Sequence, residues 1–175
     1  LLTMYRQIPW IDEKVYEDKA TESTSNTQFT YEELWQKVIA DFQTAYDVLP
    51  AKQKDGGRVN KIAAAGYLAK CYLTIAWGDG YEATDGVDHI NKEYMQKVID
   101  YTDVVKNSDY GYMADFGDIF LPDYKNNKES VFAVQTSDYS EDHTTFGRAN
   151  WSNMLNGCWG IWSCGWDFHK PSQNL

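Results

Sequence analysis

The sequence predicts a mainly α-helical protein of helical hairpins, followed by a loop-rich segment with one or two short β-strands. Two observations predict this fold. Between residues 30 and 107, three stretches repeat apolar residues with helical period, and each follows a residue that can cap a helix. From residue 108 this period fades, and Gly, Asn, Ser and Trp become frequent, which is typical of loops. We expect one domain, with helices over 30–107 and loops over 108–175.

The first residues carry weaker signals. Residues 1–11 are typical of the end of a helix that leads into an aromatic–proline turn, Ile8-Pro9-Trp10. Residues 12–28 are polar and rich in Glu, Thr, Ser and Asn. This composition predicts a surface loop.

The first strong helix is predicted from residue 31 to residue 49. Thr30 and Glu33 have the Ser/Thr-x-x-Glu spacing of a capping box, and Phe29 and Leu34 can form a hydrophobic staple across it. The apolar stripe that follows consists of Leu34, Val38, Phe42, Ala45 and Leu49.

Two further helices follow. One begins after Asn60, a good N-cap, and its small residues over 62–69 allow neighbouring helices to approach on more than one side. The other covers 91–107, with Asp88 or Asn91 as its cap. Its stripe consists of Tyr94, Val98, Tyr101 and Val105. Three successive amphipathic helices, of which the central one is rich in small residues, indicate a tetratricopeptide-like hairpin array.

The stretch 115–135 consists of three consecutive parts that differ in composition. An apolar and aromatic part ending at Pro122 predicts a buried segment, and the Lys- and Asn-rich residues 125–128 predict an exposed turn. The run near 131–135 is typical of a short strand.

Charge excludes some classes of partner. The chain has 16 Lys and Arg against 26 Asp and Glu, a formal net charge of −10, so binding to nucleic acid or to anionic lipid by charge is not expected. Aromatic residues make up 15% of the chain, which favours a sugar-stacking surface. Both ends are typical of running sequence, and we expect an internal piece of a longer protein with any lipid anchor upstream.

The cysteines and histidines predict no metal site. Cys71 falls in a helical pattern and is expected to be a small buried residue. Cys158 and Cys164 are close enough to bridge, but spacing alone leaves that open. The three histidines stand at no metal-ligand spacing, and no cofactor motif is present.

Four blocks of the sequence together resemble the SusD/RagB family of Bacteroidetes outer-membrane nutrient-binding lipoproteins. The blocks are YEELWQKVIADFQTAYDVLP at 31–50, GRVNK with the Ala-rich run after 57, DFGDIFLPDYKNNKESVF at 115–132, and PSQNL at 171–175. Their order and spacing agree with the family. Gly66 and Lys70 stand where the family more typically has Leu and Arg.

This resemblance implies tetratricopeptide-like hairpins in a protein that is lipid-anchored on the outer surface of the outer membrane. It implies a partner, a TonB-dependent transporter of the SusC type, over which the protein sits as a lid. The implied function is the capture of a glycan, or in some members a peptide, for import. It implies no enzyme activity and no cofactor.

The candidate glycan-binding residues lie in the loop-rich segment. Sugar rings stack on Trp, and their hydroxyls bond to Asn, Asp and Arg. The candidates are Trp151, Trp159, Trp162, Trp166, Asn150, Asn153, Arg148, Asp167 and Tyr139. Alternatively, the four Trp side chains fill a loop-rich core, and Tyr139 belongs to a solvated loop.

Two other functions remain open from the sequence. A tetratricopeptide-like scaffold can bind a peptide or protein in a groove lined with Asn, Arg and Tyr. A glycoside hydrolase would need two carboxylates across a cleft, for which the loop-rich segment offers several acidic residues. These are Asp138, Glu141, Asp142 and Asp167. A solvated acidic loop accounts for them better, and catalysis is not expected.

Overall fold

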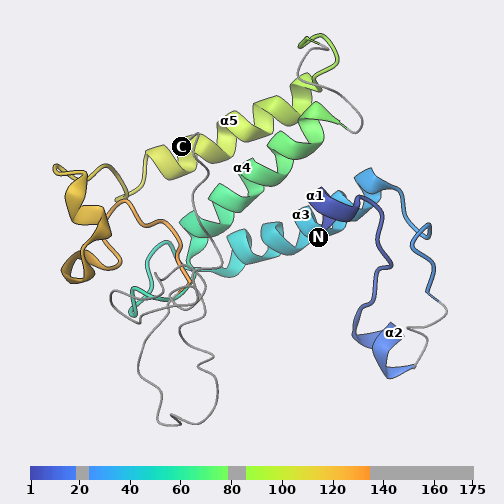
Figure 1. Cartoon of the computed structure of the whole chain (residues 1–175), viewed down its shortest axis with the longest axis horizontal. Coiled ribbons are helices and arrows are strands. Elements are labelled where there is room, and N and C mark those ends of the chain that lie inside the picture. Colours follow the sequence, from blue (N-terminus) through green and yellow to red (C-terminus); the bar gives the residue numbers. More distant parts are fainter. Residues whose placement is uncertain (19–23, 79–85, 135–175) are drawn as a thin grey trace, which may run out of the picture. The chain divides into compact units, whose positions relative to one another are not determined.

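A computed structural model of the chain describes residues 1–18, 24–78 and 86–134, and its described elements are all helices (Figure 1). The α-helices are α1 (Leu2–Tyr5), α2 (Glu13–Glu17), α3 (Tyr31–Val48), α4 (Lys61–Trp77) and α5 (Lys92–Lys106). Two 3₁₀ turns follow, η2 (Gly117–Phe120) and η3 (Pro122–Tyr124). The mainly α-helical prediction is confirmed. The chain divides into two compact units, 1–133 and 134–175, and all the described helices belong to the first.

Helix α4 is the centre of the helical array, because it packs against both α3 and α5 (Figure 1). Its small side chains make this possible, as the sequence predicted. Four alanines of α4 are buried, and they let two neighbours approach its backbone on different sides. The four are Ala63, Ala64, Ala65 and Ala76.

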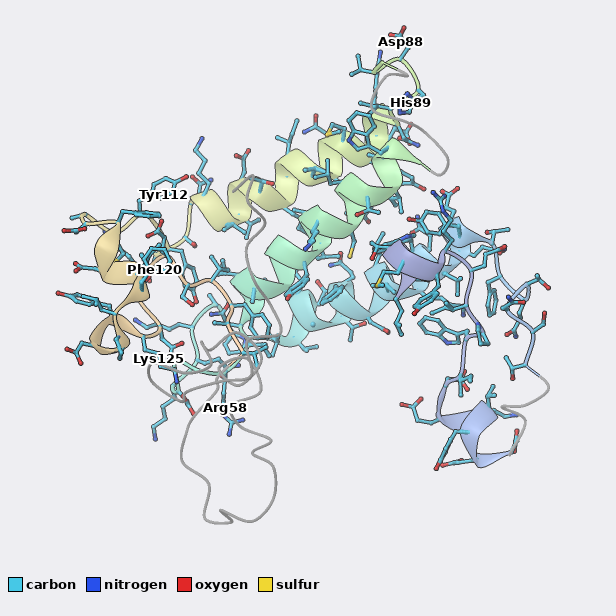
Figure 2. The ribbon with its side chains drawn as sticks, in the orientation of Figure 1. Arg58, Asp88, His89, Tyr112, Phe120 and Lys125 are labelled. Atoms are coloured by element: carbon cyan, nitrogen blue, oxygen red, sulfur yellow. The ribbon has the colours of Figure 1, made fainter. Side chains whose placement is uncertain are left out.

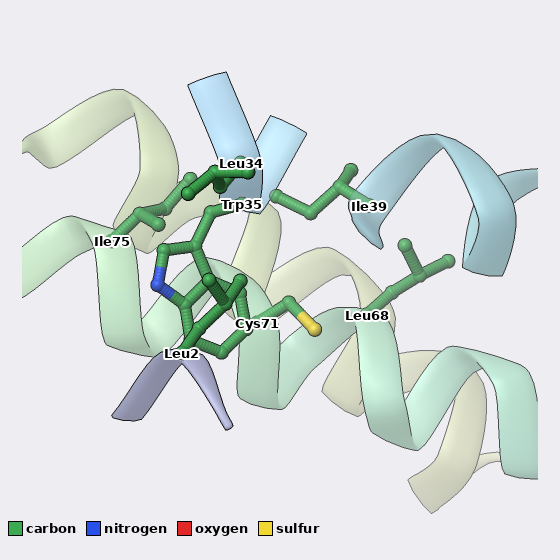
Figure 3. Close-up of a cluster of buried hydrophobic side chains, with 7 residues drawn as sticks. All are labelled: Leu2, Leu34, Trp35, Ile39, Leu68, Cys71 and Ile75. Carbon is green, nitrogen blue, oxygen red and sulfur yellow. The ribbon is translucent and has the colours of Figure 1, made fainter. Parts of the chain in front are cut away.

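One apolar cluster joins α1, α3 and α4 (Figure 3). Leu34 of α3 and Leu68 of α4 are both 0% exposed. Leu2 of α1 belongs to the same cluster, so the short N-terminal helix is held by the core. The other members are Trp35, Ile39, Cys71 and Ile75.

Cys71 lies in this core as a free thiol, as predicted. Burial raises the pKa of its thiol to about 11, although the charge of the nearby Lys70 acts in the opposite direction. The thiolate that would react or bind metal is therefore suppressed at neutral pH.

The helix starts follow the predicted caps. The Thr30 backbone N–H donates to Glu33 Oε2 at 2.8 Å, and the Glu33 backbone N–H donates to Thr30 Oγ1 at 3.2 Å, which confirms the capping box. The bond from the Thr30 backbone lowers the pKa of the Glu33 carboxyl. Asn60 caps α4, and Asn91 rather than Asp88 caps α5.

Within 12–28, the loop prediction is wrong over α2. Asp12 starts this helix, because its Oδ1 accepts the Val15 backbone N–H at 2.9 Å. Lys14 and Asp18 then form an ion pair of 3.3 Å, one helical turn apart. A single good cap thus gives a short helix within a polar composition.

The short strand predicted near 131–135 is wrong over 131–134. These residues form a bend followed by irregular backbone, and residue 135 lies outside the described residues. A strand needs a neighbour to complete its hydrogen-bond ladder. The Val131 backbone N–H instead donates to Glu129 O at 3.1 Å, within its own turn.

The apolar part of 115–121 is also not buried among the described residues. Phe116 is 73% exposed and Phe120 is 70% exposed, and their rings meet edge to face at 5.3 Å. Tyr112 and Phe120 both lie on the segment that follows α5 (Figure 2). The η2 turn directs these rings at one another rather than into the helical core, which an apolar pattern alone does not predict.

Candidate functional site

Tyrosines from three helices stack across the helical array. The rings of Tyr72 (α4) and Tyr101 (α5) are nearly parallel, at 9° and 5.9 Å between centroids. Tyr94 of α5 lies 5.9 Å from Tyr72, and Tyr46 of α3 meets Tyr101 edge to face at 5.5 Å. Tyr94 and Tyr101 belong to the predicted stripe of the third helix, so that stripe faces its neighbours.

Hydrogen bonds from these tyrosines connect α5 to α3. The Tyr94 hydroxyl donates to Glu32 Oε1 at 2.7 Å and accepts from Gln36 Nε2 at 3.1 Å. This bond to Glu32 raises the pKa of the Tyr94 hydroxyl. The Tyr101 hydroxyl donates to Gln43 Oε1 at 2.6 Å. These bonds join α5 to α3 at two places, residues 32–36 and residue 43 of α3.

A cavity of about 780 Å³, called here the helix groove, lies between α3 and α5. Tyr72 contributes to its lining from α4. The Lys37 ammonium lies 4.3 Å from the Phe29 ring centroid, a cation–π contact. The remaining lining residues are Thr30, Glu32, Glu33, Gln36, Glu93, Tyr94 and Lys97. This mixed polar and aromatic lining suits an extended ligand such as a peptide.

A second cavity of about 470 Å³, called here the loop pocket, lies where three connecting segments meet. These are the α3–α4 connection with the start of α4, the end of α5 with the residues after it, and the polar turn at 126–130. Asn60 joins two of them: its Oδ1 accepts from the Ala63 backbone N–H at 2.9 Å, and its Nδ2 donates to the Tyr110 hydroxyl at 2.7 Å. Asn60 is only 6% exposed.

All nine candidate glycan-binding residues predicted from the sequence lie outside the described residues. This holds for Tyr139, Arg148, Asn150, Trp151, Asn153, Trp159, Trp162, Trp166 and Asp167. The acidic residues weighed for hydrolysis, together with Cys158 and Cys164, also lie beyond residue 134. Their assignment therefore stays a prediction.

The part of the chain that the structure describes contains no group of three or more His, Cys, Asp and Glu side chains placed to hold a metal ion. Over the same residues, no helix is both long enough and apolar enough to cross a membrane.

The sequence did not predict either cavity. The blocks at 57–61 and 126–130 carry separate parts of the family resemblance, and they meet in the loop pocket. The sequence offered one signal for the loop pocket: both blocks are polar and both lie next to helix ends, so they could have been expected to meet. The helix groove forms only when α4 brings α3 and α5 together, which no local pattern encodes.

The chain is similar to a known protein over most of its length. A SusD-like protein of Bacteroides ovatus is 31% identical over 136 residues, which cover 75% of this chain and 24% of the relative. The chain thus spans about a quarter of that relative's length. No family model matches the chain.

Proposed function

The chain belongs to the SusD-like family, and from that membership we propose that it is part of a cell-surface protein that captures a glycan and delivers it to a TonB-dependent outer-membrane transporter. The relationship to the Bacteroides ovatus protein carries this proposal. Its partners would be the glycan and a SusC-like transporter, with attachment to the outer membrane through a lipid anchor upstream. The proposed activity is binding without cleavage of the glycan.

The physical character of the chain supports this proposal. A net charge of −10 makes nucleic acid a poor ligand, whereas neutral sugars bind by stacking and hydrogen bonds that need no net charge. Trp side chains stack on the apolar faces of sugar rings, and the stretch over 148–167 holds four of the seven Trp residues of the chain. We assign glycan contact to the Trp-rich stretch over 148–167.

We expect Trp151→Ala and Trp162→Ala each to weaken glycan binding by about tenfold, because an aromatic anchor in a binding surface contributes more than about 1 kcal/mol. The measurement is isothermal titration calorimetry with an oligosaccharide of whichever polysaccharide binds the wild type. Trp77→Ala is the matched control, since Trp77 lies on α4 and contacts His89 with ring centroids 5.3 Å apart. Wild-type affinity in both test variants would exclude these two residues as the sugar platform.

The helix groove favours a second candidate function, the binding of a peptide. It is open, lies between two fixed helices, and presents Tyr, Gln, Glu and Lys side chains. Stacked helix pairs commonly use such concave surfaces for extended ligands. Titration of the wild type and of Gln36→Ala with a random-sequence peptide library would distinguish the two functions. If the helix groove binds peptides, Gln36→Ala should weaken peptide binding and leave glycan binding unchanged.

A further inference from the structure

Hydrogen bonds hold the described loops that line the loop pocket. The Lys61 backbone N–H donates to Pro50 O at 3.0 Å, which closes the connection between α3 and α4. The Gln53 amide donates to Val59 O at 2.7 Å within that connection. The Gly111 backbone N–H donates to Lys128 O at 2.9 Å and holds the polar turn in place. A pocket fixed in this way loses little conformational entropy when a ligand binds.

The charge around the pocket is opposite to that of the chain as a whole. Three cations line it, Lys52, Arg58 and Lys128, against two carboxylates, Asp55 and Asp109. In a chain with a formal net charge of −10, this is a local excess of positive charge. Asp55 takes up part of it, because its Oδ2 lies 3.8 Å from Arg58 Nε in an exposed ion pair. Lys52 and Lys128 come from separate segments and add to the field of the pocket.

The remaining polar lining suits a saccharide. Amide and hydroxyl side chains from all three segments reach the pocket, and such groups can donate to and accept from sugar hydroxyls. Asn107 and Ser130 are among them. Gln53 and Asn127 add amides of which one polar atom each is already used, Gln53 Nε2 by Val59 O and Asn127 Oδ1 by the Glu129 backbone N–H. Tyr110 adds an aromatic ring, held by its hydrogen bond from Asn60. Amides and hydroxyls would bind the ring hydroxyls, while the lysines would pair with a carboxylate.

We propose that the loop pocket binds the carboxylate-bearing residue of an acidic oligosaccharide, so that the glycan class includes uronic acids. This inference rests on the proposed function and names its ligand class. It adds a site in the helical part of the chain, apart in sequence from the Trp-rich stretch. Lys128 would pair with the uronate carboxylate, and Lys52 would strengthen the attraction from the α3–α4 connection.

The test compares charged and uncharged forms of the same sugar. Calorimetric titrations would use trigalacturonate and trimannuronate, each beside its uncharged methyl ester, with the wild type and the Lys128→Gln variant. We expect at least one acid to bind about tenfold more tightly than its ester, and Lys128→Gln to remove that preference. The preference should also shrink as salt rises from about 50 to about 500 mM, because salt screens exposed charges.

Lys125→Gln is the matched control. It makes the same change of charge three residues away, at a position that does not line the pocket. Thermal melting followed by circular dichroism would verify that both variants fold. If acid and ester bind equally, or if Lys128→Gln and Lys125→Gln have the same effect, the inference is wrong. Retardation of the wild type by neutral polysaccharides would then leave the proposed function intact, while binding of trigalacturonate without any polysaccharide binding would support the pocket alone.

Discussion

Replacing Leu68 by alanine is expected to lower the free energy of unfolding by about 2–5 kcal/mol, because it removes a fully buried side chain and leaves a cavity. Leu68 is 0% exposed and lies in the middle of α4, the helix that packs against both α3 and α5. The alanines of α4 hold the neighbouring helices close, so the surrounding backbone has little freedom to collapse into the cavity. Urea denaturation followed by circular dichroism measures the change.

Leu73→Ala is the matched control for this prediction. Leu73 lies on the same helix and undergoes the same change of side chain, but it is 42% exposed. Its replacement should cost less than half as much as the replacement of Leu68. Equal losses for the two variants would mean that α4 is not the buried centre of the array.

Asn60→Ala is expected to cost about 1–3 kcal/mol of stability, which is large for one polar side chain. Two interactions disappear together: the cap on the Ala63 backbone N–H at 2.9 Å and the donation to the Tyr110 hydroxyl at 2.7 Å. The site is 6% exposed, so water replaces these partners poorly. Chemical denaturation of the variant measures the total loss.

Two controls separate the parts of this effect. Asn91→Ala removes an N-cap of the same type from α5, but Asn91 is exposed, and about 0.5–1 kcal/mol is expected. Tyr110→Phe removes only the partner of Asn60 Nδ2 and leaves the cap in place. A loss for Asn60→Ala no greater than that for Asn91→Ala would show that burial and the Tyr110 bond add nothing.

The helices could be predicted because their signals are local. Thr30 with Glu33, Asn60 and Asn91 mark helix starts through bonds to backbone groups two or three residues away. The apolar stripes then follow from helical period. The helix α2 was missed because its only marker is the cap Asp12, without an apolar stripe.

What depends on distant partners could not be predicted in this way. The pattern at 131–134 is typical of a strand, but a strand needs a neighbouring strand, and no single segment specifies one. Phe116 and Phe120 were expected to be buried, yet they contact each other and remain exposed. The loop pocket joins segments about 70 residues apart, from the start of α4 to the turn at 126–130, so only tertiary structure reveals it.

The central claim is that the protein to which this chain belongs binds a glycan and does not cleave it. Affinity electrophoresis through gels that contain individual neutral and acidic polysaccharides tests this most directly, with the chain length of each polysaccharide measured before and after incubation. The expected result is retardation by at least one polysaccharide whose length stays unchanged. Free migration through every gel, or shortening of the polysaccharide that retards the protein, would contradict the claim.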